Sequence, residues 1–351
     1  MKAVYYRPGR GPGRFGVRSA LRAALEHSGL QIADHTDDPD ATCSTLVSDI
    51  DLSTYRGAAD VWITDLSGMR MSGEVGPPVS DELGIPHVIA EPDRQLAVSE
   101  DEAGIRKLFD GASHVVTTSS LTCRYIDRLS PGFVTQLPAF LDVDPFLAAH
   151  KVRDNHRSGL ARSLGIRPES TWLLAHVSAD PADSVDSLQL LAKALSRLVM
   201  MDWHLVVIGD DSHATRMSLV TLPRERIRYC ERNSLPSFAA LCASCDIYVW
   251  PAFDDASDGF VLEAQASGLA VIAGRNDVTE DQAIDGKTGR LLPAGNSESF
   301  ANAISFLLRH PDMLRTFREN SREFMRLERG LAAGAAGIRD ILEQLSSDTD
   351  A

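Results

Sequence analysis

The chain has 351 residues, of which 44% are apolar and 24% charged, an ordinary composition for a globular protein. At roughly 150 residues per domain, this length predicts two domains. The 35 lysines and arginines are outnumbered by 49 aspartates and glutamates, which gives a formal net charge of −14. Such an acidic surface repels phosphate backbones and anionic lipids, so we expect neither general nucleic-acid binding nor a membrane-surface role.

The cysteines do not form the pattern of a disulfide framework, because they are few and odd in number. They are Cys43, Cys123, Cys230, Cys242 and Cys245. The last two have C-x-x-C spacing, but no second pair or nearby histidine completes a zinc site, so we expect both in a helical core. The chain contains neither an apolar run of about 20 residues, as a membrane span requires, nor a signal-peptide core at its start. The prediction is a cytoplasmic protein with no transmembrane segment.

Strand-like and helix-like segments alternate along the first part of the chain. Ala3–Tyr6 is the first expected strand, and Val17–Ser28 has the apolar spacing of an amphipathic helix. Gly29 follows it at the position where helices favour a left-handed residue. Further strands are expected at Leu30–Ala33, Val61–Thr64, His87–Ala90, Val115–Thr118 and Val134–Leu137.

The same pattern begins again in the second part of the chain. Strands are expected at Trp172–Val177, His204–Gly209, Ile227–Cys230, Ile247–Trp250 and Ala270–Ala273. Short, continuously apolar runs joined by helices indicate parallel sheets covered on both faces. The fold class is therefore α/β, with two doubly wound, Rossmann-like parallel-sheet domains.

We place the first domain at residues 1–142 and the second at residues 143–330. From Pro311 onward the chain reads as largely helical. The segment Leu331–Gly337 contains Gly334 and Gly337, which weaken an isolated helix. We therefore expect residues 331–351 to form a helix that packs back on the first domain.

A glycine-rich loop follows the first strand. Gly11-Pro12-Gly13-Arg14-Phe15-Gly16 has the G-x-G-x-x-G spacing of a dinucleotide-binding turn, and Asp34 lies near the distance expected for a ribose-binding acid. Four residues, Arg7–Arg10, separate the strand from Gly11, whereas a dinucleotide turn begins directly after its strand. The loop is therefore either a simple connector or a loop whose amides, with Arg10 and Arg14, face an acceptor; a nicotinamide-dependent oxidoreductase is the third alternative.

The most informative segment is Trp250–Pro293. Asp255 precedes Glu263 by eight positions, and Glu263 opens an expected helix within Leu262–Val271 (LEAQASGLAV). This segment is followed later by Asp285-Gly286-Lys287-Thr288-Gly289-Arg290-Leu291-Leu292-Pro293. In these motifs, in their order and spacing, the sequence resembles the retaining, family-4-type glycosyltransferases of the GT-B fold (glycosyl transferases group 1). The resemblance is strong over residues 134–325 and weaker over the first 130.

The resemblance implies that the second domain holds a nucleotide-diphosphate sugar and the first an acceptor, with transfer at retained anomeric configuration and no cofactor. Glu263 then holds the donor ribose and Asp255 contacts the transferred sugar. Backbone amides at the start of the helix suit the diphosphate. The donor-side residues are Gly259, Phe260, Val261, Leu262, Gly209 and Glu280. The alternatives are that Glu263 is an exposed first-turn acid and Asp255 a loop acid.

The sequence departs from the family where a basic pair normally neutralises the diphosphate. Asp180 stands at the arginine position and Ser184 at the lysine position. Losing such partners typically costs about 10²–10³ in rate apiece. Either a divalent cation sits among Asp180, Asp183 and Asp255, or Arg232 or Arg275 moves in, or the chain no longer transfers sugar. We expect a site without metal. The alternative is a non-catalytic descendant of the family that binds a nucleotide sugar or a protein partner.

The first domain carries fewer chemical signals. Acceptor-side residues are expected in loops that follow strand ends, where α/β proteins place ligand groups. They are Arg10, Gly13, Arg14, Arg70, Glu91 and Arg94. His87 lies inside a strand and is expected to be packed and hydrogen-bonded. The acceptor itself, whether a glycan, a lipid-linked molecule or a small molecule, is not identified by these residues.

Overall fold

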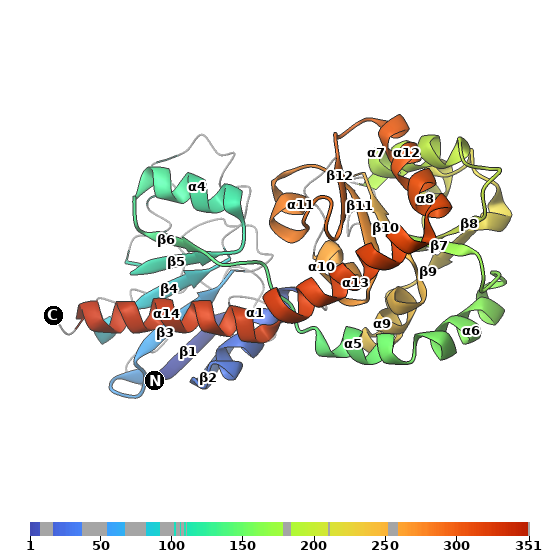
Figure 1. Ribbon diagram of the computed structural model, residues 1–351. Coiled ribbons are helices and arrows are strands. Elements are labelled where there is room, and N and C mark those ends of the chain that lie inside the picture. The colour runs from blue at the N-terminus through green and yellow to red at the C-terminus, as the bar shows by residue number, and fades with distance from the viewer. Residues whose placement is uncertain are drawn as a thin grey trace. The chain divides into compact units, whose positions relative to one another are not determined.

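The computed structural model describes residues 1–7, 17–36, 55–66, 82–91, 102, 106, 109, 111–177, 184–209, 211–251 and 259–349. The chain divides into two compact units (Figure 1). Unit 1 comprises Met1–Ala139 together with Leu331–Ala351, and unit 2 comprises Phe140–Gly330. Unit 1 is therefore built from both ends of the chain, and unit 2 from one continuous segment.

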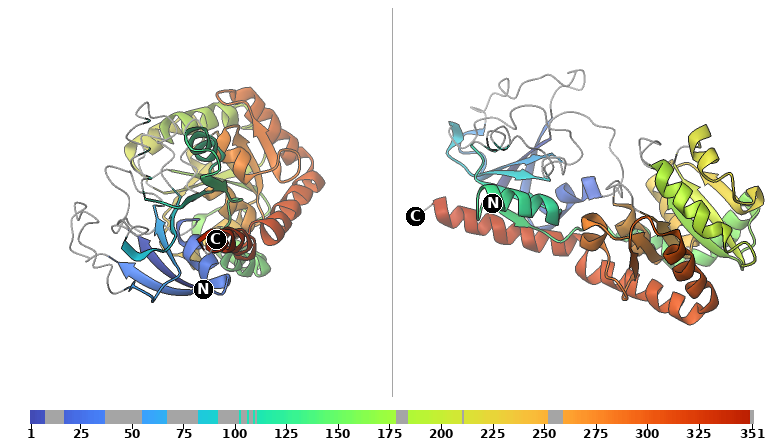
Figure 2. Two further views of the ribbon diagram at one scale, coloured as in Figure 1. Left: turned by 90° about the vertical axis from the view of Figure 1, so that its left-hand side faces the viewer. Right: turned by 90° about the horizontal axis from the view of Figure 1, so that it is seen from above.

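Unit 1 contains a six-stranded parallel sheet in the order β2-β1-β3-β4-β5-β6. Its strands are β1 (Lys2–Arg7), β2 (Gln31–Thr36), β3 (Val61–Asp65), β4 (His87–Ala90), β5 (His114–Thr117) and β6 (Val134–Gln136). Its helices include α1 (Val17–His27), α4 (Ser120–Leu129) and α14 (Leu331–Thr349). Helix α14 lies beside α1 (Figure 2), and a Cβ added at Gly337 would come within 2.6 Å of Leu137 Cδ2. The glycine that weakens this helix thus permits a close approach to the segment after β6.

Unit 2 contains a second six-stranded parallel sheet in the order β12-β11-β10-β7-β8-β9. Its strands are β7 (Thr171–His176), β8 (Trp203–Ile208), β9 (Ile227–Cys230), β10 (Ile247–Trp250), β11 (Ala270–Gly274) and β12 (Gly289–Leu292). Its helices are α5 (Asp144–Lys151), α6 (Arg153–Leu164), α7 (Val185–Ser196), α8 (His213–Ser218), α9 (Leu235–Ser244), α10 (Phe260–Ala266), α11 (Asp277–Gln282), α12 (Ser297–Arg309) and α13 (Pro311–Glu328).

The two sheets confirm the predicted pair of doubly wound α/β folds. Every predicted strand is present with ends shifted by a few residues, and Gly29 has the expected positive φ of 84°. Strand β12 was not predicted, because its exposed Arg290 interrupts a short apolar run. A Cβ at Gly289 would stand 1.9 Å from the Val271 carbonyl oxygen on β11. This motif glycine is therefore needed for the strand to pair at all.

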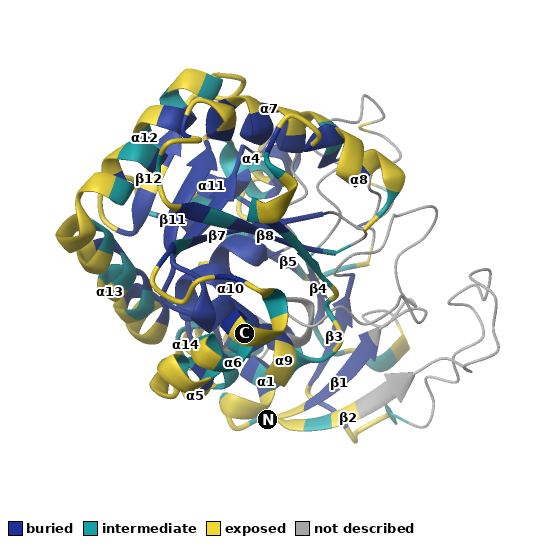
Figure 3. Ribbon diagram, turned by 90° about the vertical axis from the view of Figure 1, so that its right-hand side faces the viewer, coloured by how far each residue is buried: buried dark blue, intermediate teal, exposed yellow. Residues whose placement is uncertain are grey.

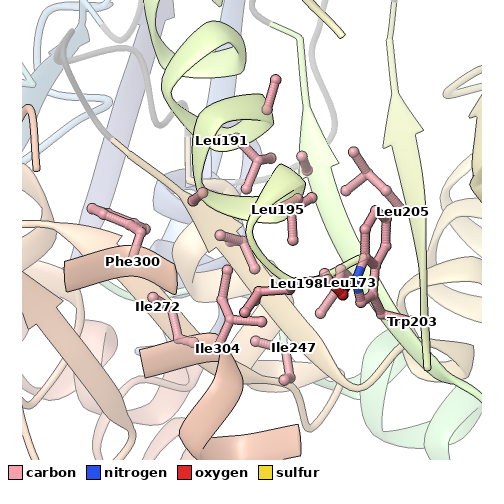
Figure 4. Packing of buried hydrophobic residues seen from close by; sticks show 14 of the residues in the cluster. Leu173, Leu191, Leu195, Leu198, Trp203, Leu205, Ile247, Ile272, Phe300 and Ile304 are labelled. Carbon is pink, nitrogen blue, oxygen red and sulfur yellow. Dashed lines mark hydrogen bonds between the residues drawn. The ribbon is translucent and has the colours of Figure 1, made fainter. Parts of the chain in front are cut away.

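The core of unit 2 lies between its sheet and helices α7 and α12. Leu191 and Leu195 of α7 and Ile304 of α12 pack over side chains of the strands (Figure 4). Most strand residues of unit 2 are dark blue in Figure 3, whereas much of α12 and α13 is exposed. Because strands β7, β10 and β11 are buried on both faces, they present continuous apolar runs, which is why they were predictable.

A cluster of ion pairs around Asp246 connects helices α6 and α13 to the sheet of unit 2. Asp246, just before β10, accepts from Arg153 Nη2 at 2.6 Å and from Arg157 Nη1 at 3.1 Å, both on α6. Arg318 of α13 lies 3.4 Å away, and the Trp172 backbone N–H donates to the same carboxylate at 2.9 Å. One buried carboxylate thus anchors two helices and two strands.

The cysteine pair is part of the core, as predicted. Cys242 of α9 and Cys245 after it are buried free thiols. Within the described residues, no group of three or more histidine, cysteine or acidic side chains has the arrangement of a metal site. None of the helices described is both long and apolar enough to cross a membrane.

Candidate functional site

The candidate site lies at the carboxyl ends of the strands of unit 2, where parallel α/β sheets place ligands. Helix α10 follows β10 and a segment, 252–258, that lies outside the described residues. Gly259 precedes the helix with a positive φ of 85°. Glu263 N donates the first helical bond to Gly259 O at 3.0 Å, so the amides of Phe260, Val261 and Leu262 precede the helical ladder. These amides are the predicted diphosphate ligands.

Glu263 is fully buried, which rules out an exposed first-turn acid. Its Oε1 accepts a hydrogen bond from Arg232 Nη2 at 2.6 Å. Its Oε2 is also buried and has no hydrogen-bond partner among the described residues. Burial raises the pKa of this carboxyl to about 7, although the Arg232 guanidinium acts in the opposite direction. A buried carboxylate oxygen without a donor is a site where a ligand hydroxyl could bind.

Arg232 follows β9 and is held by more than this ion pair. Its guanidinium lies 4.0 Å from the ring centroid of Phe238 and 4.9 Å from that of Phe260. Phe238 belongs to α9 and Phe260 begins α10. The arginine therefore stacks between two helices while it bonds to the carboxylate. From the sequence, Arg232 was considered only as a residue that moves toward a diphosphate. In the structure its guanidinium bonds to Glu263 instead.

Sequence reasoning missed a buried histidine at the end of β7. The His176 ring is fully buried and stacks on Phe260, with centroids 4.1 Å apart and planes 13° from parallel. It also contacts Trp250 at 3.9 Å between centroids, and its Nδ1 lies 2.8 Å from the Tyr248 hydroxyl. His176 thus packs against Phe260, the first residue of α10. Its place at the end of an apolar strand is the one signal that could have identified it.

Gly209, at the end of β8, allows two backbone segments to meet. Its φ is +123°, and a Cβ there would lie 2.9 Å from Val177 O. Gly209 N donates to Cys230 O at 3.0 Å. The predicted donor-side glycine therefore has a structural reason of its own, and its role toward a donor stays a prediction.

Glu280 is exposed in the first turn of α11 and pairs with Arg275, Nη1 to Oε1, at 2.8 Å. The same guanidinium bonds to Asp285 through Nη2 at 2.7 Å. Exposed pairs of this kind contribute little to stability, because solvent screens them, so Arg275 can exchange them for another anion at little cost. Of the two arginines considered as replacements for the missing basic pair, Arg275 is the less constrained.

The segment expected to carry the diphosphate-binding charges is described only in part. Ser184 is fully buried and precedes α7, whereas Asp180 and Asp183 lie outside the described residues. Asp255, the predicted contact of the transferred sugar, also lies outside them. The structure therefore gives no geometry for the aspartate cluster.

Of the acceptor-side predictions, Glu91 alone is described; Arg10, Gly13, Arg14, Arg70 and Arg94 lie outside the described residues. Glu91 follows β4 with a left-handed φ of 54°, which is costly for a residue other than glycine. Its Oε1 accepts from the Thr118 backbone N–H at 2.9 Å, after β5. Backbone strain is often found at functional positions, so the conformation of Glu91 is consistent with an acceptor-side role, which stays a prediction.

Two further polar contacts lie in the sheet of unit 1. The Tyr5 hydroxyl donates to the buried carboxylate of Asp65 at the end of β3, a pair that the sequence analysis did not identify. His87 Nε2 lies 2.8 Å from Thr64 Oγ1, and burial lowers the pKa of His87 to about 4. His87 is therefore the packed, hydrogen-bonded histidine that was expected.

Sequence comparisons relate the chain to known glycosyltransferases. A family model described as Glycosyl transferases group 1 matches residues 173–310. The chain is 24% identical over 304 residues to D-inositol 3-phosphate glycosyltransferase 2 of Catenulispora acidiphila, covering 79% of this chain and 70% of that protein. It is 34% identical over 139 residues to phosphatidyl-myo-inositol mannosyltransferase of Mycobacterium leprae, covering 39% of this chain and 34% of that protein. The chain thus spans between a third and about two-thirds of these relatives' lengths.

Solved structures share the whole fold at low sequence identity. Sucrose-phosphate synthase from Thermosynechococcus elongatus matches with a TM-score of 0.76 and 17% identity, over 99% of this chain and 100% of that one. HepE of Anabaena, solved in complex with UDP, matches with a TM-score of 0.73 and 15% identity, over 98% and 100% of the two chains. The chain has the GT-B fold.

Proposed function

We propose that this chain, whose second unit belongs to the Glycosyl transferases group 1 family over residues 173–310, transfers a sugar from a nucleotide-diphosphate donor to an acceptor with retention of configuration. The observation that carries the proposal is the buried Glu263, which has one oxygen on Arg232 and the other without a described partner. A ribose hydroxyl is a suitable donor to that second oxygen, and charge-assisted bonds of this kind are short and strong.

The start of α10 supports the same donor orientation. Backbone N–H groups ahead of the first helical bond are available to an anion, and Glu263 lies one turn further on. A nucleotide whose ribose binds Glu263 then presents its diphosphate toward Gly259. Asp255, as the sugar contact, completes the proposed donor site.

The acceptor is the least constrained part of the proposal. Relatives named as inositol phosphate glycosyltransferases make phosphorylated inositols the first acceptors to assay. In unit 1, Glu91 and the predicted loop residues Arg10, Arg14, Arg70 and Arg94 supply charges of both signs for such a molecule.

The first test is titration calorimetry with UDP, GDP and ADP and their hexose conjugates, with and without Mg²⁺ or Mn²⁺. We expect metal-independent binding that Glu263→Ala weakens at least tenfold. Glu298→Ala is the matched control, because Glu298 is also a first-turn glutamate, exposed on α12. Tight binding that survives Glu263→Ala unchanged would disprove the ribose assignment, and binding only with metal would point to the aspartate loops.

The second candidate function is donor or partner binding without transfer. Ser184 stands buried where the family carries a lysine, so one charge that stabilises the leaving diphosphate is absent from the sequence. Release of nucleoside diphosphate, followed with each sugar donor and the inositol phosphate acceptors, separates the two. Any acceptor-dependent turnover removes this second candidate.

A further inference from the structure

Arg232 is fixed on several sides by the residues around the candidate donor site. Its Nη2 bonds to Glu263 at 2.6 Å, and its guanidinium stacks on Phe238 of α9 and Phe260 of α10. The side chain is only 18% exposed. An arginine in this setting has little freedom to leave for another anion.

Moving Arg232 onto a diphosphate would leave the Glu263 carboxylate buried and without a positive partner. Breaking a buried pair by removing one member is strongly unfavourable, because the other charge stays in the protein interior. The ion pair therefore has a different function from replacing the missing basic residues. The two oxygens of Glu263 have different partners: Oε1 accepts from Arg232, and Oε2 is left for a ligand.

We propose that Arg232 is a positioning residue of the donor site, which keeps Glu263 ionised and aimed so that Oε2 accepts a hydroxyl of the donor ribose. The inference rests on the proposed function for the identity of the ligand. Its electrostatic part rests on the protein alone and can be tested without any nucleotide.

The groups that face Glu263 come from three elements. Arg232 follows β9, Cys242 lies on α9, and the Ser267 hydroxyl donates to the Glu263 backbone carbonyl at 2.9 Å from the end of α10. Burial raises the pKa of the Cys242 thiol well above its usual value, so this group is neutral. Among the described residues that act on Glu263, Arg232 alone brings a charge.

Replacing Arg232 with a neutral residue should therefore raise the pKa of Glu263 further, so that the carboxyl is mostly protonated at pH 7.5. An opposite charge at hydrogen-bond distance typically shifts a carboxyl pKa by about 1–3 units. A protonated carboxyl keeps its place but loses part of its capacity to accept, and its remaining bonds are no longer charge-assisted. The ribose contact should weaken although Glu263 itself is unchanged.

The first experiment measures stability without nucleotide. Denaturation midpoints are recorded from pH 5 to 9.5 for wild type, Arg232→Met, Arg232→Lys and Arg216→Met. Arg216 is the matched control, since it also stacks on an aromatic ring, Tyr229 at 5.0 Å, and pairs with Asp211, but on the surface. We expect Arg232→Met to move the carboxyl titration upward by about 1–3 pH units, and Arg232→Lys and Arg216→Met to leave it within about half a unit.

The second experiment compares UDP, ADP and GDP with their 2′-deoxy counterparts by calorimetry. Wild type should prefer the ribonucleotide about 10- to 100-fold at pH 7.5, as expected for one hydrogen bond to a charged group. Arg232→Met should lose this preference at pH 7.5 and recover part of it by pH 9.5, whereas Arg232→Lys should retain most of it.

The outcomes separate the two proposals. If wild type binds none of these nucleotides, or does not distinguish the deoxy forms, the proposed ribose contact is wrong, and the stability titration still tests Arg232. If Arg232→Met titrates like Arg216→Met, or keeps the full ribonucleotide preference at pH 7.5, Arg232 is not the positioning residue. A loss of preference that does not change between pH 7.5 and 9.5 also overturns the inference, because ionisation would then play no part.

Discussion

The burial of Glu263 makes a quantitative prediction about stability and pH. Its carboxyl pKa rises from 4.5 to about 7 on folding, chiefly through burial. Between these values the folded chain binds more protons than the unfolded chain, so the free energy of unfolding falls as pH rises through this window. At 1.36 kcal/mol per pKa unit, the loss attributable to Glu263 is about 3 kcal/mol, complete by about pH 8.

Glu263→Gln isolates this contribution. The amide oxygen can still accept from Arg232, while the titrating group is removed. Urea denaturation of both proteins between pH 4.5 and 8 should give a difference in unfolding free energy that shifts by about 3 kcal/mol in favour of the glutamine variant. The difference between the two proteins is the quantity to follow, because histidines titrate in the same range.

Glu298→Gln, on the exposed start of α12, should show no such change with pH. Parallel profiles for wild type and Glu263→Gln would refute the reasoning. They would mean either that Glu263 keeps an ordinary pKa because its interaction with Arg232 offsets burial, or that the side chain is solvated.

Further expected outcomes concern stability. Wild type should lose free energy of unfolding as the pH falls from 6.5 to 4, because the folded-state pKa of His87 is about 4 and the unfolded chain binds more protons in this range. His87→Asn should lack this part of the loss, and denaturation at pH 4, 5 and 6.5 measures the difference. Asp246→Asn should destabilise unit 2 by about 3–5 kcal/mol through three arginines left without their shared carboxylate, whereas Asp202→Asn, in an exposed pair with Arg167, should cost under about 1 kcal/mol in the same urea titration. Gly289→Ala should prevent β12 from pairing with β11 and lower the thermal midpoint far more than Gly159→Ala in α6, where an added Cβ meets no neighbour within 4 Å; equal midpoints would contradict the role given to Gly289.

The sequence predicted the sheets well because their signal is local. Strands such as Ile247–Trp250 are apolar at every position, since a parallel strand covered on both faces has no polar side. β12 was missed because its exposed Arg290 interrupts the apolar run and its glycine is required by Val271, a residue distant in sequence. The sequence of neither strand by itself predicts how closely the two strands approach each other.

The candidate site was predictable in its residues but not in its electrostatics. The motif around Glu263 identified the residue, yet one-dimensional spacing describes an acid at a helix start and not its complete burial. Arg232 and His176 come from the ends of other strands, and only the sheet order brings them to α10. Their contacts depend on aromatic rings from α9, α10 and β10, which no motif connects.

The composition of unit 1 from two separate segments of the chain has a consequence for limited proteolysis. Phe140–Gly330 is a single uninterrupted stretch, whereas α14 follows unit 2 in sequence and packs on α1 of unit 1. A cut just after Gly330 therefore separates α14 covalently from the rest of unit 1 but leaves every element of unit 2 on one fragment. A variant that ends at Gly330 should keep the protease resistance of unit 2 while α1 of unit 1 loses the helix that packs on it.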